Sequence, residues 1–430
     1  MARAMKDSGI AWIGEIPEEW TIERGKNILK LLERPVQEND GVITCFRDGE
    51  VTLRSKRREE SFTISLQEAG YQGIEPGDLV VHGMDGFAGA IGISDSRGKG
   101  TPVLNVMDSS QSKRYLMYYL RCAAYCGLFL SLATGIRVRS CDTNWNKLKN
   151  ILYILPPLEE QRKIIRFLDS ECARIDALIE QTRASIEEYK KLKQVVITQA
   201  VTKGIRPNRP MKDSGIEWIG KMPEEWSVRP LKAYMDILPG YAFSSNDFDT
   251  ENGVPLLRGI NVSPDSIRWN DTVYWNQPIT EQLEQYLLQN NDLVVGLDRP
   301  WISEGTRVAF ITDKDLPCLL LQRVCRIRPT KNIDIRFIYH AIAGKAFEEA
   351  LSTETTGVSV PHISTKQIQE FIVALPDMSE QAEICDYLDA QCNKINALIA
   401  KKALLLDELE NYKKALIYEY VTGKRRCSNE

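Results

Sequence analysis

Long apolar runs and histidines are scarce in this sequence of 430 residues. No stretch approaches the ~20 consecutive apolar residues of a membrane-spanning helix, and the first residues are polar, unlike the apolar core of a signal peptide. The three histidines, His82, His340 and His362, are isolated and lack the close pairing of a metal site. These absences predict a cytoplasmic protein without membrane contact or metal centre.

Paired cysteines are missing as well. The ten cysteines occur singly, without two Cys-x-x-Cys pairs at zinc-finger distance. Cys122 and Cys126 are four residues apart in an apolar run, which is typical of helix packing. Without an export signal, this pattern predicts reduced thiols.

The catalytic motifs of enzymes that act on DNA are also absent. There is no Walker A loop and no Asn/Asp-Pro-Pro-aromatic tetrapeptide, and the glycine patterns at 86–92 and 98–100 are more typical of turns than of a cofactor loop. The net charge of −4 opposes nonspecific coating of nucleic acid but leaves a locally basic reading surface open. We therefore expect neither a catalytic centre nor a cofactor on this chain.

What the sequence does contain is an internal repeat. Residues 5–20 and 211–226 are identical at 13 of 16 positions, at an offset of 206. Residues 155–204 and 375–424 align without gaps at an offset of 220. Chance does not produce such matches, so the chain is a tandem duplication whose interiors differ in length and look largely unrelated. Each half has a start motif, a variable α/β domain and a long closing helix.

Apolar residues in the two closing segments follow alternating steps of four and three. Such a seam predicts a helix that packs against a partner helix, here its own duplicate. The seam residues are Leu168, Cys172, Ile175, Ile179, Ile186 and Tyr189 in the first helix and Leu388, Cys392, Ile395, Ile399, Leu406 and Leu409 in the second. A helix of roughly 45 residues is on the order of 70 Å long, so the pair is either a rigid spacer or the core of a dimer-like body.

Shorter elements are predicted inside the variable domains. Residues 78–81, 292–295 and 319–327 have the composition of buried strands. Residues 115–132 and 335–351 have the periodicity of helices. His340 lies in the second of these and is predicted to be a packed side chain.

Cations in the first half are candidate DNA contacts. Four of them crowd into residues 54–58, which suits phosphate contacts but equally a solvated charged loop. Two more alternate in the Thr-Gly segment 134–139, our predicted base-reading edge, because arginine pairs bidentately with guanine. With the loop histidine, the candidates are Arg54, Lys56, Arg57, Arg58, His82, Arg137 and Arg139.

The second half offers different polar residues on a matched frame. Its Thr-Gly segment, 356–364, keeps the alternation but replaces arginine by serine and histidine, as reading a different DNA sequence would require. Other candidates come from 240–243, 258–261 and 299–301, where turn or core roles are equal alternatives. The second-half candidates are Tyr241, Arg258, Asn261, Arg299, Trp301, Ser359, His362 and Ser364.

These motifs resemble a known family. The start motif MKDSGIxWIGxxPEEW, the opening Leu-Pro-Pro-Leu-Glu-Glu-Gln at 155–161 and the Thr-Gly loops, all duplicated, resemble the specificity subunit of type I restriction–modification systems. Residues 240–243 and 322–324 also resemble that family's target-recognition domains. The second helix opening, Leu-Pro-Asp-Met-Ser-Glu-Gln at 375–381, is less regular but keeps Leu, Pro, Glu and Gln.

The resemblance implies a fold of class α/β (α+β), with two target-recognition domains joined by two long antiparallel helices in an internal pseudo-twofold repeat. The domains would be residues 1–154 and 205–374, with spacer helices at 155–204 and, including the C-terminal tail, 375–430. Each domain would read one half of a bipartite site in double-stranded DNA, and the helices would set the spacer between the halves.

The resemblance also implies partners. Two modification subunits with S-adenosylmethionine would methylate adenine, and restriction subunits would use ATP and Mg for translocation and cleavage. This chain would be non-catalytic. The rival hypotheses are a coiled-coil protein-interaction scaffold without sequence-specific DNA reading, and a standalone DNA enzyme, which the missing motifs disfavour.

Overall fold

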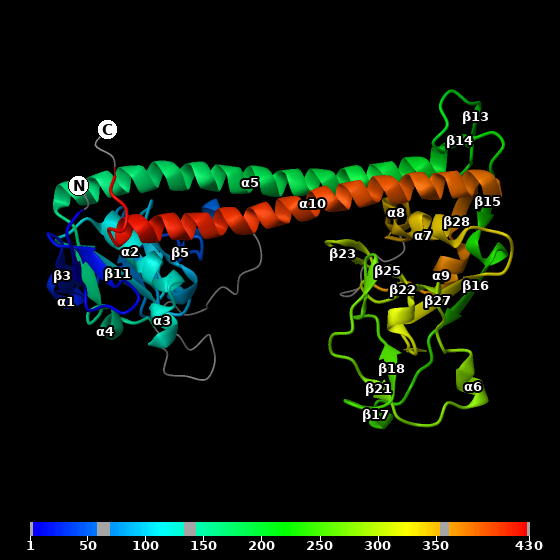
Figure 1. The fold of residues 1–430 in the computed structure, drawn as a ribbon, viewed down its shortest axis with the longest axis horizontal. Coiled ribbons are helices and arrows are strands. Elements are labelled where there is room, and N and C mark those ends of the chain that lie inside the picture. The colour runs from blue at the N-terminus through cyan, green and yellow to red at the C-terminus, as the bar shows by residue number, and fades with distance from the viewer. Residues whose placement is uncertain (1–2, 58–68, 133–142, 353–360, 428–430) are drawn as a thin grey trace. The chain divides into compact units, whose positions relative to one another are not determined.

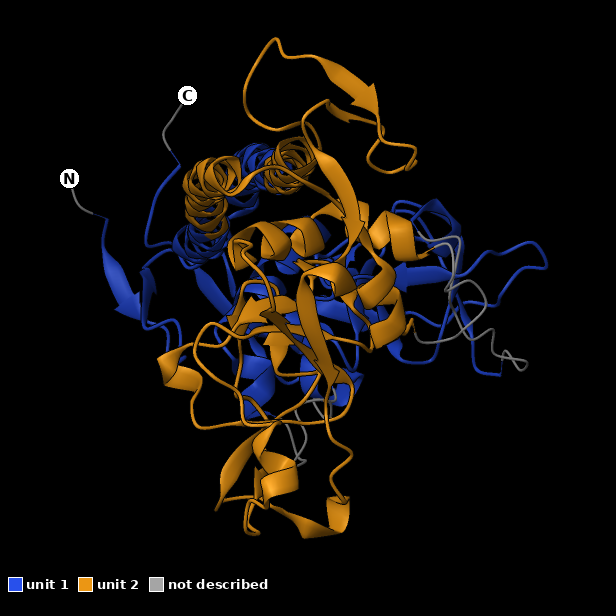
Figure 2. Cartoon of the chain, turned by 90° about the vertical axis from the view of Figure 1, so that its right-hand side faces the viewer, with its two compact units in different colours: residues 1–183, 404–430 blue, residues 184–403 orange. Residues whose placement is uncertain are grey.

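The computed structural model describes residues 3–57, 69–132, 143–352 and 361–427 (Figure 1). The chain divides into two compact units, residues 1–183 with 404–430 (unit 1) and residues 184–403 (unit 2). Both long helices, α5 (Leu158–Lys203) and α10 (Met378–Val421), contribute to both units (Figure 2). The boundaries between the units therefore lie within the two long helices, whereas the four-segment division expected from the sequence keeps each helix whole.

The centre of unit 1 is a four-stranded antiparallel sheet with the order β4-β11-β8-β9. Its strands are β4 (Leu29–Leu31), β8 (Leu79–His82), β9 (Ile91–Ile93) and β11 (Leu104–Ser109). Strand β8 is buried on both faces: Leu79 and Val81 join one apolar core, and Val80 joins another. An uninterrupted apolar run suits such a strand, and the predicted strand at 78–81 is confirmed.

The other elements of unit 1 surround this sheet. The paired strands are β1 (Met5–Asp7) with β2 (Glu15–Pro17), β3 (Thr21–Arg24) with β12 (Leu152–Leu155), β5 (Ile43–Cys45) with β6 (Val51–Leu53), and β7 (Gln72–Ile74) with β10 (Gly98–Gly100). The short helices are α1 (Gly25–Ile28), α2 (Lys113–Tyr125), α3 (Leu128–Ser131) and α4 (Trp145–Leu148).

Unit 2 is built on the same sheet topology. Its antiparallel sheet has the order β16-β27-β22-β25, formed by β16 (Met235–Pro239), β22 (Leu293–Gly296), β25 (Val308–Phe310) and β27 (Val324–Pro329). In both sheets the strands, numbered along the chain, lie in the order first, fourth, second, third. The two variable domains thus have central sheets of the same topology, although their sequences look unrelated.

Unit 2 also contains a second sheet, in the order β17-β21-β18-β26, that lengthens its variable domain. Its strands are β17 (Phe248–Asp249), β18 (Val254–Leu257), β21 (Tyr274–Trp275) and β26 (Leu319–Leu320). The remaining pairs are β13 (Met211–Asp213) with β14 (Lys221–Pro223), β15 (Ser227–Pro230) with β28 (Ile372–Leu375), β19 (Val262–Ser263) with β20 (Ser266–Ile267), and β23 (Trp301–Ile302) with β24 (Gly305–Thr306). Its short helices are α6 (Glu281–Glu284), α7 (Ile335–Ala343), α8 (Lys345–Ser352) and α9 (Thr365–Glu370).

Three predicted elements are interrupted in the structure. The expected strand at 319–327 divides into β26 and β27 because Arg323 adopts a left-handed φ of 72°. The expected helix at 115–132 divides into α2 and α3 at Gly127, whose φ is 79°. The expected helix at 335–351 divides into α7 and α8 at Gly344, which is extended.

Within each unit the two long helices run antiparallel, because higher residue numbers on one meet lower numbers on the other. The facing pairs on the helices are Asp176 with Lys413 and Arg183 with Glu410 in unit 1, and Tyr189 with Lys402 in unit 2. In unit 2, Arg206 just beyond the end of α5 also pairs with Glu383 on α10. Both helices begin just after a proline-bearing turn with glutamates in the first turn. Gly204 and Gly423, at φ values of 73° and 74°, follow their C-terminal ends.

The predicted seam residues line the inner side of these helices. Leu168, Cys172, Ile175, Ile179, Ile186, Leu388, Cys392 and Ile395 are buried, and Tyr189, Ile399, Leu406 and Leu409 are half-buried. The buried seam residues of unit 1 share one core with α2 as well as with the end of α10. The seam therefore packs against a domain as well as against a helix.

A polar cluster fixes the start of α5 in unit 1. Glu160 accepts a hydrogen bond from Trp20 Nε1 at 2.9 Å and forms an ion pair with Arg3 at 2.7 Å. Gln161 Nε2 donates to the Pro156 carbonyl at 2.9 Å, and Gln161 Oε1 accepts from the Ser112 amide that begins α2, at 3.3 Å. We call Arg3, Trp20, Glu160 and Gln161 clasp 1.

The same cluster recurs at the start of α10 in unit 2. Trp226 Nε1 donates to Glu380 at 2.9 Å, and Arg209 pairs with Glu380 at 2.6 Å. Gln381 Nε2 donates to the Pro376 carbonyl at 2.9 Å, and Oε1 accepts from the Asp334 amide that begins α7, at 3.0 Å. We call Arg209, Trp226, Glu380 and Gln381 clasp 2. The clasps explain why the start motif and the helix openings are duplicated together.

Candidate nucleic-acid interface

In unit 1 the central strand β8 ends beside the segment that follows the Thr-Gly loop. The Gly83 amide donates to the Val103 carbonyl at 2.7 Å, and the Thr143 amide donates to the Gly83 carbonyl at 2.7 Å. Three parts of the chain thus meet at Gly83. We call residues 82–85, 103 and 143 rim 1.

Unit 2 repeats this arrangement at the end of β22. The Leu297 amide donates to the Arg323 carbonyl at 2.9 Å, and the Ile363 amide donates to the Leu297 carbonyl at 3.0 Å. Leu297 is therefore the equivalent of Gly83, Arg323 of Val103, and Ile363 of Thr143. We call residues 296–299, 323 and 361–363 rim 2.

Rim 2 carries exposed charged side chains. The Asp298 carboxylate lies 2.7 Å from His362 Nδ1 and 3.2 Å from Arg323 Nη1. Arg299 is exposed beside them, and its amide donates to the Pro361 carbonyl at 2.8 Å. Arg299 and Arg323 both have a left-handed φ, 45° and 72°, which side-chain-bearing residues rarely adopt. Strained residues held by their surroundings are frequent at binding sites.

Rim 1 presents an apolar residue and a neutral histidine. His82 is the last residue of β8 rather than part of a loop, and its Nδ1 accepts from the amides of Met84 at 3.2 Å and Asp85 at 3.0 Å. Burial lowers the pKa of His82, which agrees with an unprotonated Nδ1. The Met84 side chain projects with 51% of its surface exposed.

The first-half cations at 54–57 are paired within unit 1. Arg57 lies over the Phe46 ring at 4.1 Å and pairs with Glu50 at 2.9 Å and with Asp48, whose hydrogen bond raises the pKa of Arg57. Lys56 pairs with Asp95 at 3.2 Å, and Arg54 Nε donates to Thr44 at 3.3 Å. Their phosphate contacts stay a prediction. Arg58, Arg137, Arg139 and Ser359 lie outside the described residues.

The second-half candidates are distributed over several environments. Arg299 and His362 belong to rim 2. Tyr241 is half-buried, 4.9 Å from the Phe243 ring and 5.2 Å from the Tyr286 ring, and Trp301 on β23 packs against the unit 2 core. Ser364 caps α9 by accepting from the Gln367 amide at 3.2 Å. These three side chains have folding roles whether or not they meet DNA.

The loop at 258–261 corrects one prediction. Asn261 is 0% exposed, and its side chain accepts from the Arg258 amide at 3.0 Å and donates to the carbonyls of Arg268 and Asn270 at 2.9 and 3.0 Å. Every bond of the amide is thus used inside the loop, so Asn261 is not a surface contact. Arg258 Nη1 donates to the Asp271 carbonyl at 2.9 Å and is half-buried.

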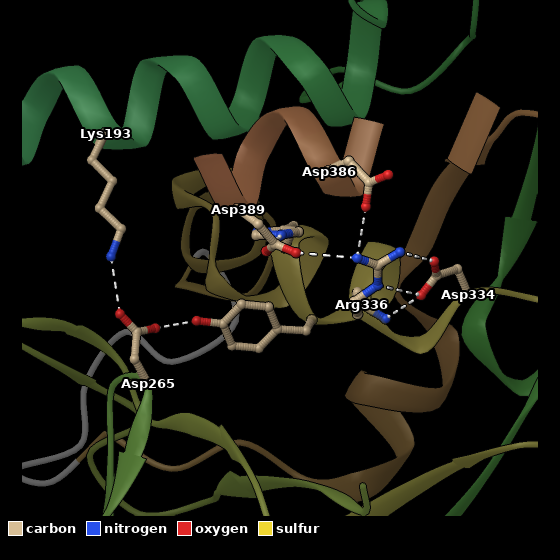
Figure 3. A network of polar contacts seen from close by, with 8 residues as sticks. Lys193, Asp265, Asp334, Arg336, Asp386 and Asp389 are labelled. Atoms are coloured by element: carbon tan, nitrogen blue, oxygen red, sulfur yellow. Dashed lines mark hydrogen bonds and ion pairs between the residues drawn. The ribbon is translucent and has the colours of Figure 1, made fainter. Parts of the chain in front are cut away.

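A polar network joins α7 to the parts of α5 and α10 in unit 2 (Figure 3). Lys193 pairs with Asp265 at 3.0 Å, and the Tyr339 hydroxyl donates to the same carboxylate. Arg336 pairs with Asp334, Asp386 and Asp389 at 2.9, 2.9 and 3.2 Å. The network fixes α7 against the parts of α5 and α10 that belong to unit 2.

His340 completes this network. It is 2% exposed, as predicted for a packed side chain, and its Nε2 lies 3.1 Å from Asp389. Burial lowers the pKa of His340, so the neutral ring donates this hydrogen bond. In unit 1, Arg114 and Tyr118 contact the matched residue Asp169 at 2.7 and 2.8 Å.

The described ranges lack the features of a metal-binding cluster and of a membrane-spanning helix. No cluster of three or more His, Cys, Asp or Glu side chains in these ranges has the arrangement of a metal site. None of the helices in them combines the length and apolar character of a membrane crossing.

Each rim was only partly accessible from the sequence, through His82 in rim 1 and Arg299 and His362 in rim 2. Asp298 and Met84 were missed because each follows a strand end without a motif of its own. Arg323 lay inside a segment predicted to be a continuous strand. The available signal was the offset between the two halves, which pairs position 103 with 323 and position 143 with 363, as it pairs residues 155–204 with 375–424.

Comparison with known proteins gives one consistent family. Residues 223–408 match the type I restriction modification DNA specificity domain. The chain is 32% identical over 282 residues to the type I restriction enzyme MjaVIII specificity subunit of Methanocaldococcus jannaschii, covering 65% of this chain and 64% of the relative. It is 34% identical over 211 residues to the EcoAI specificity subunit of Escherichia coli, covering 48% of this chain and 35% of the relative. The chain thus spans less than two thirds of either relative's length.

Solved structures share the fold. A chain from a structure of the type I R-M system superposes with a TM-score of 0.71 at 17% identity, covering 95% of this chain and 99% of that one. The HsdS subunit from Thermoanaerobacter tengcongensis gives a TM-score of 0.50 at 18% identity, with 97% and 100% covered. The predicted fold class, a mixture of helices and strands with two long helices, is confirmed.

Proposed function

Because residues 223–408 of this chain belong to the type I restriction modification DNA specificity domain family, we propose that the chain is the DNA-specificity subunit of a type I restriction–modification complex. Each unit reads one half of a bipartite site in double-stranded DNA. The observation that carries the proposal is the pair of rims, in which one backbone frame presents different side chains. Reading two different half-sites with a duplicated protein calls for this combination, since base contacts specify while the frame positions.

The proposal extends to partner subunits. Ala177 and Leu178 on α5 match Ala397 and Leu398 on α10, and all four are exposed, the leucines by 41% and 40%. Equivalent exposed apolar residues support two docking sites of one kind. We assign them to two modification subunits that carry S-adenosylmethionine, joined by restriction subunits that use ATP and Mg. We place this complex in the cytoplasm, where the chain selects the DNA site and contributes no catalytic group.

Methylome sequencing tests the proposal. A host that expresses this chain with its modification subunit should acquire one bipartite, adenine-methylated motif, and the motif should vanish when this chain is omitted. The double variant Leu178→Glu, Leu398→Glu should abolish methylation by releasing the partner. Methylation of no motif, with the complex intact by gel filtration, would favour the scaffold hypothesis instead.

A further inference from the structure

Rim 1 and rim 2 differ in chemistry at equivalent positions. Gly83 and Leu297 make the same two backbone hydrogen bonds, so the residues that follow them, Met84 and Asp298, occupy the same place in their units. Val103 and Arg323 are equivalent for the same reason, because their carbonyls accept hydrogen bonds from the amides of Gly83 and Leu297. One frame therefore presents a methionine and a valine in unit 1 and an aspartate and an arginine in unit 2.

The arginine of rim 2 is held in a defined orientation. Asp298 Oδ1 accepts a hydrogen bond from Arg323 Nη1 at 3.2 Å. The same oxygen lies 2.7 Å from His362 Nδ1, which helps to hold the carboxylate in place. The Arg323 side chain is nevertheless 58% exposed, which leaves guanidinium N–H groups available to an external acceptor. A planar donor with one edge fixed by a carboxylate suits the O6 and N7 atoms of guanine, which accept two parallel hydrogen bonds.

The methionine of rim 1 has the opposite character. The Met84 amide is tied to His82 Nδ1 at 3.2 Å while its apolar side chain is 51% exposed. An exposed apolar side chain can contact the C5 methyl group of thymine, which distinguishes that base in the major groove.

Resting on the proposed function, we propose that each rim reads one base of its half-site: Arg323 of rim 2 contacts a guanine, and Met84 of rim 1, at the position equivalent to Asp298, contacts the methyl group of a thymine. Asp298 is the positioning residue for Arg323. The two half-sites would then differ because equivalent backbone positions present Met84 and Val103 in rim 1 but Asp298 and Arg323 in rim 2.

Single-atom changes in the DNA test the two contacts. The complex of this chain with the modification subunit is bound to DNA duplexes that carry the motif it methylates. In one series of duplexes each guanine in turn is replaced by 7-deazaguanine, and in a second series each thymine in turn is replaced by deoxyuridine. With the wild-type chain, one 7-deazaguanine should weaken binding on the order of 10-fold, and with Arg323→Ala the same replacement should have no effect. One deoxyuridine should weaken wild-type binding about 4-fold, as expected for a lost methyl contact, and should not affect Met84→Ala.

Matched variants complete the experiment. Arg323→Ala should weaken binding to the motif with ordinary bases by about 5- to 150-fold and should relax the preference at one base pair. The control is Arg229→Ala, which changes an exposed arginine on β15 and should leave the base preference unchanged. Asp298→Ala should relax the same base pair as Arg323→Ala. Asp298→Asn should restore part of the preference because its amide oxygen still accepts from Arg323.

The outcomes separate this inference from the proposed function. A motif without guanine, or equal sensitivity of wild type and Arg323→Ala to every 7-deazaguanine, would overturn the arginine contact while leaving the specificity role intact. Equal sensitivity of wild type and Met84→Ala to every deoxyuridine would do the same for the methionine contact. A wild-type complex that selects no motif would refute the proposed function and this inference with it.

Discussion

The clasps and the rims differ in what the duplication preserved. In the clasps both the side chains and their contacts recur, down to a tryptophan–glutamate hydrogen bond of 2.9 Å in each unit. In the rims the backbone hydrogen bonds recur, but the side chains do not. The clasps fix each unit to the start of a long helix, so a change of side chain there lowers the stability of the fold. The rim side chains instead project from a backbone whose hydrogen bonds do not depend on them. Repetition in this sequence therefore marks the scaffold, and divergence on a repeated frame marks the surface that we propose reads DNA.

The largest expected effect comes from breaking a clasp. Trp226→Ala should lower the free energy of unfolding by ~3–5 kcal/mol, because Trp226 is 1% exposed and its loss leaves a cavity beside Glu380. Denaturant unfolding of the full chain measures the loss. Trp20→Ala should destabilise to a similar degree through clasp 1. A clasp variant as stable as a rim variant would contradict the distinction drawn between them.

The loop of Asn261 gives a smaller effect. Asn261→Ala should cost about 1–3 kcal/mol of unfolding free energy, since the Arg258 amide and two carbonyls lose their partner in a buried site. Asn261→Asp keeps the acceptor but removes both donors and should also destabilise. If Asn261→Ala left stability unchanged and weakened DNA binding instead, the original prediction of a DNA contact would be reinstated.

A pH dependence should distinguish rim 1 from rim 2, which has Gly296 in place of His82. Burial lowers the pKa of His82 in the folded chain, so the unfolded chain binds a proton first as the pH falls. The contribution of His82 to stability is complete above its unfolded pKa of about 6.5 and is lost as the pH falls through that value toward the folded one.

Unfolding curves at about pH 7.5 and about pH 5.5 measure this dependence. Wild type should lose more stability on acidification than His82→Gln, which cannot be protonated. Because His340 titrates in both proteins, the difference between them isolates His82. Equal losses in the two proteins would show that the fold does not resist protonation of His82.

The smallest expected effect on stability comes from the rim side chains themselves. Arg323→Ala and Met84→Ala should each change the free energy of unfolding by less than about 0.5 kcal/mol, because both side chains are more than half exposed. The same unfolding experiment measures this. A large destabilisation by either variant would mean that the rims support the fold and would weaken their assignment as reading surfaces.

Much of the scaffold could be predicted from the sequence. The duplication, the two long helices, their seam and the central strands at 78–81 and 292–295 follow from local periodicity and from direct self-comparison. The resemblance to type I specificity subunits came from the same duplicated motifs. These features are encoded by residues close together in the chain or repeated along it.

The site was less accessible, because it depends on contacts between residues distant in sequence. Thr143 meets Gly83, and Ile363 meets Leu297, through backbone hydrogen bonds that no side-chain pattern announces. Arg57 reads as a free cation in the sequence, but Asp48 and Glu50 pair with it in the fold. The sequence leaves Asn261 equally open to a DNA contact and to a turn or core role, and only the fold shows that it holds a loop together from inside. Sequence composition shows which groups are present, and only the fold shows which of them are already engaged.

The division of the long helices between the units has a consequence for biosynthesis. Unit 1 contains residues that are made before all of unit 2, but its core also needs residues beyond 403 in α10, which are made after unit 2. Unit 2 is complete once residue 403 has emerged. The usual order, in which an N-terminal domain folds first during synthesis, is therefore reversed here. Until the end of α10 has been made, the apolar residues of unit 1 that it covers stay exposed in the nascent chain.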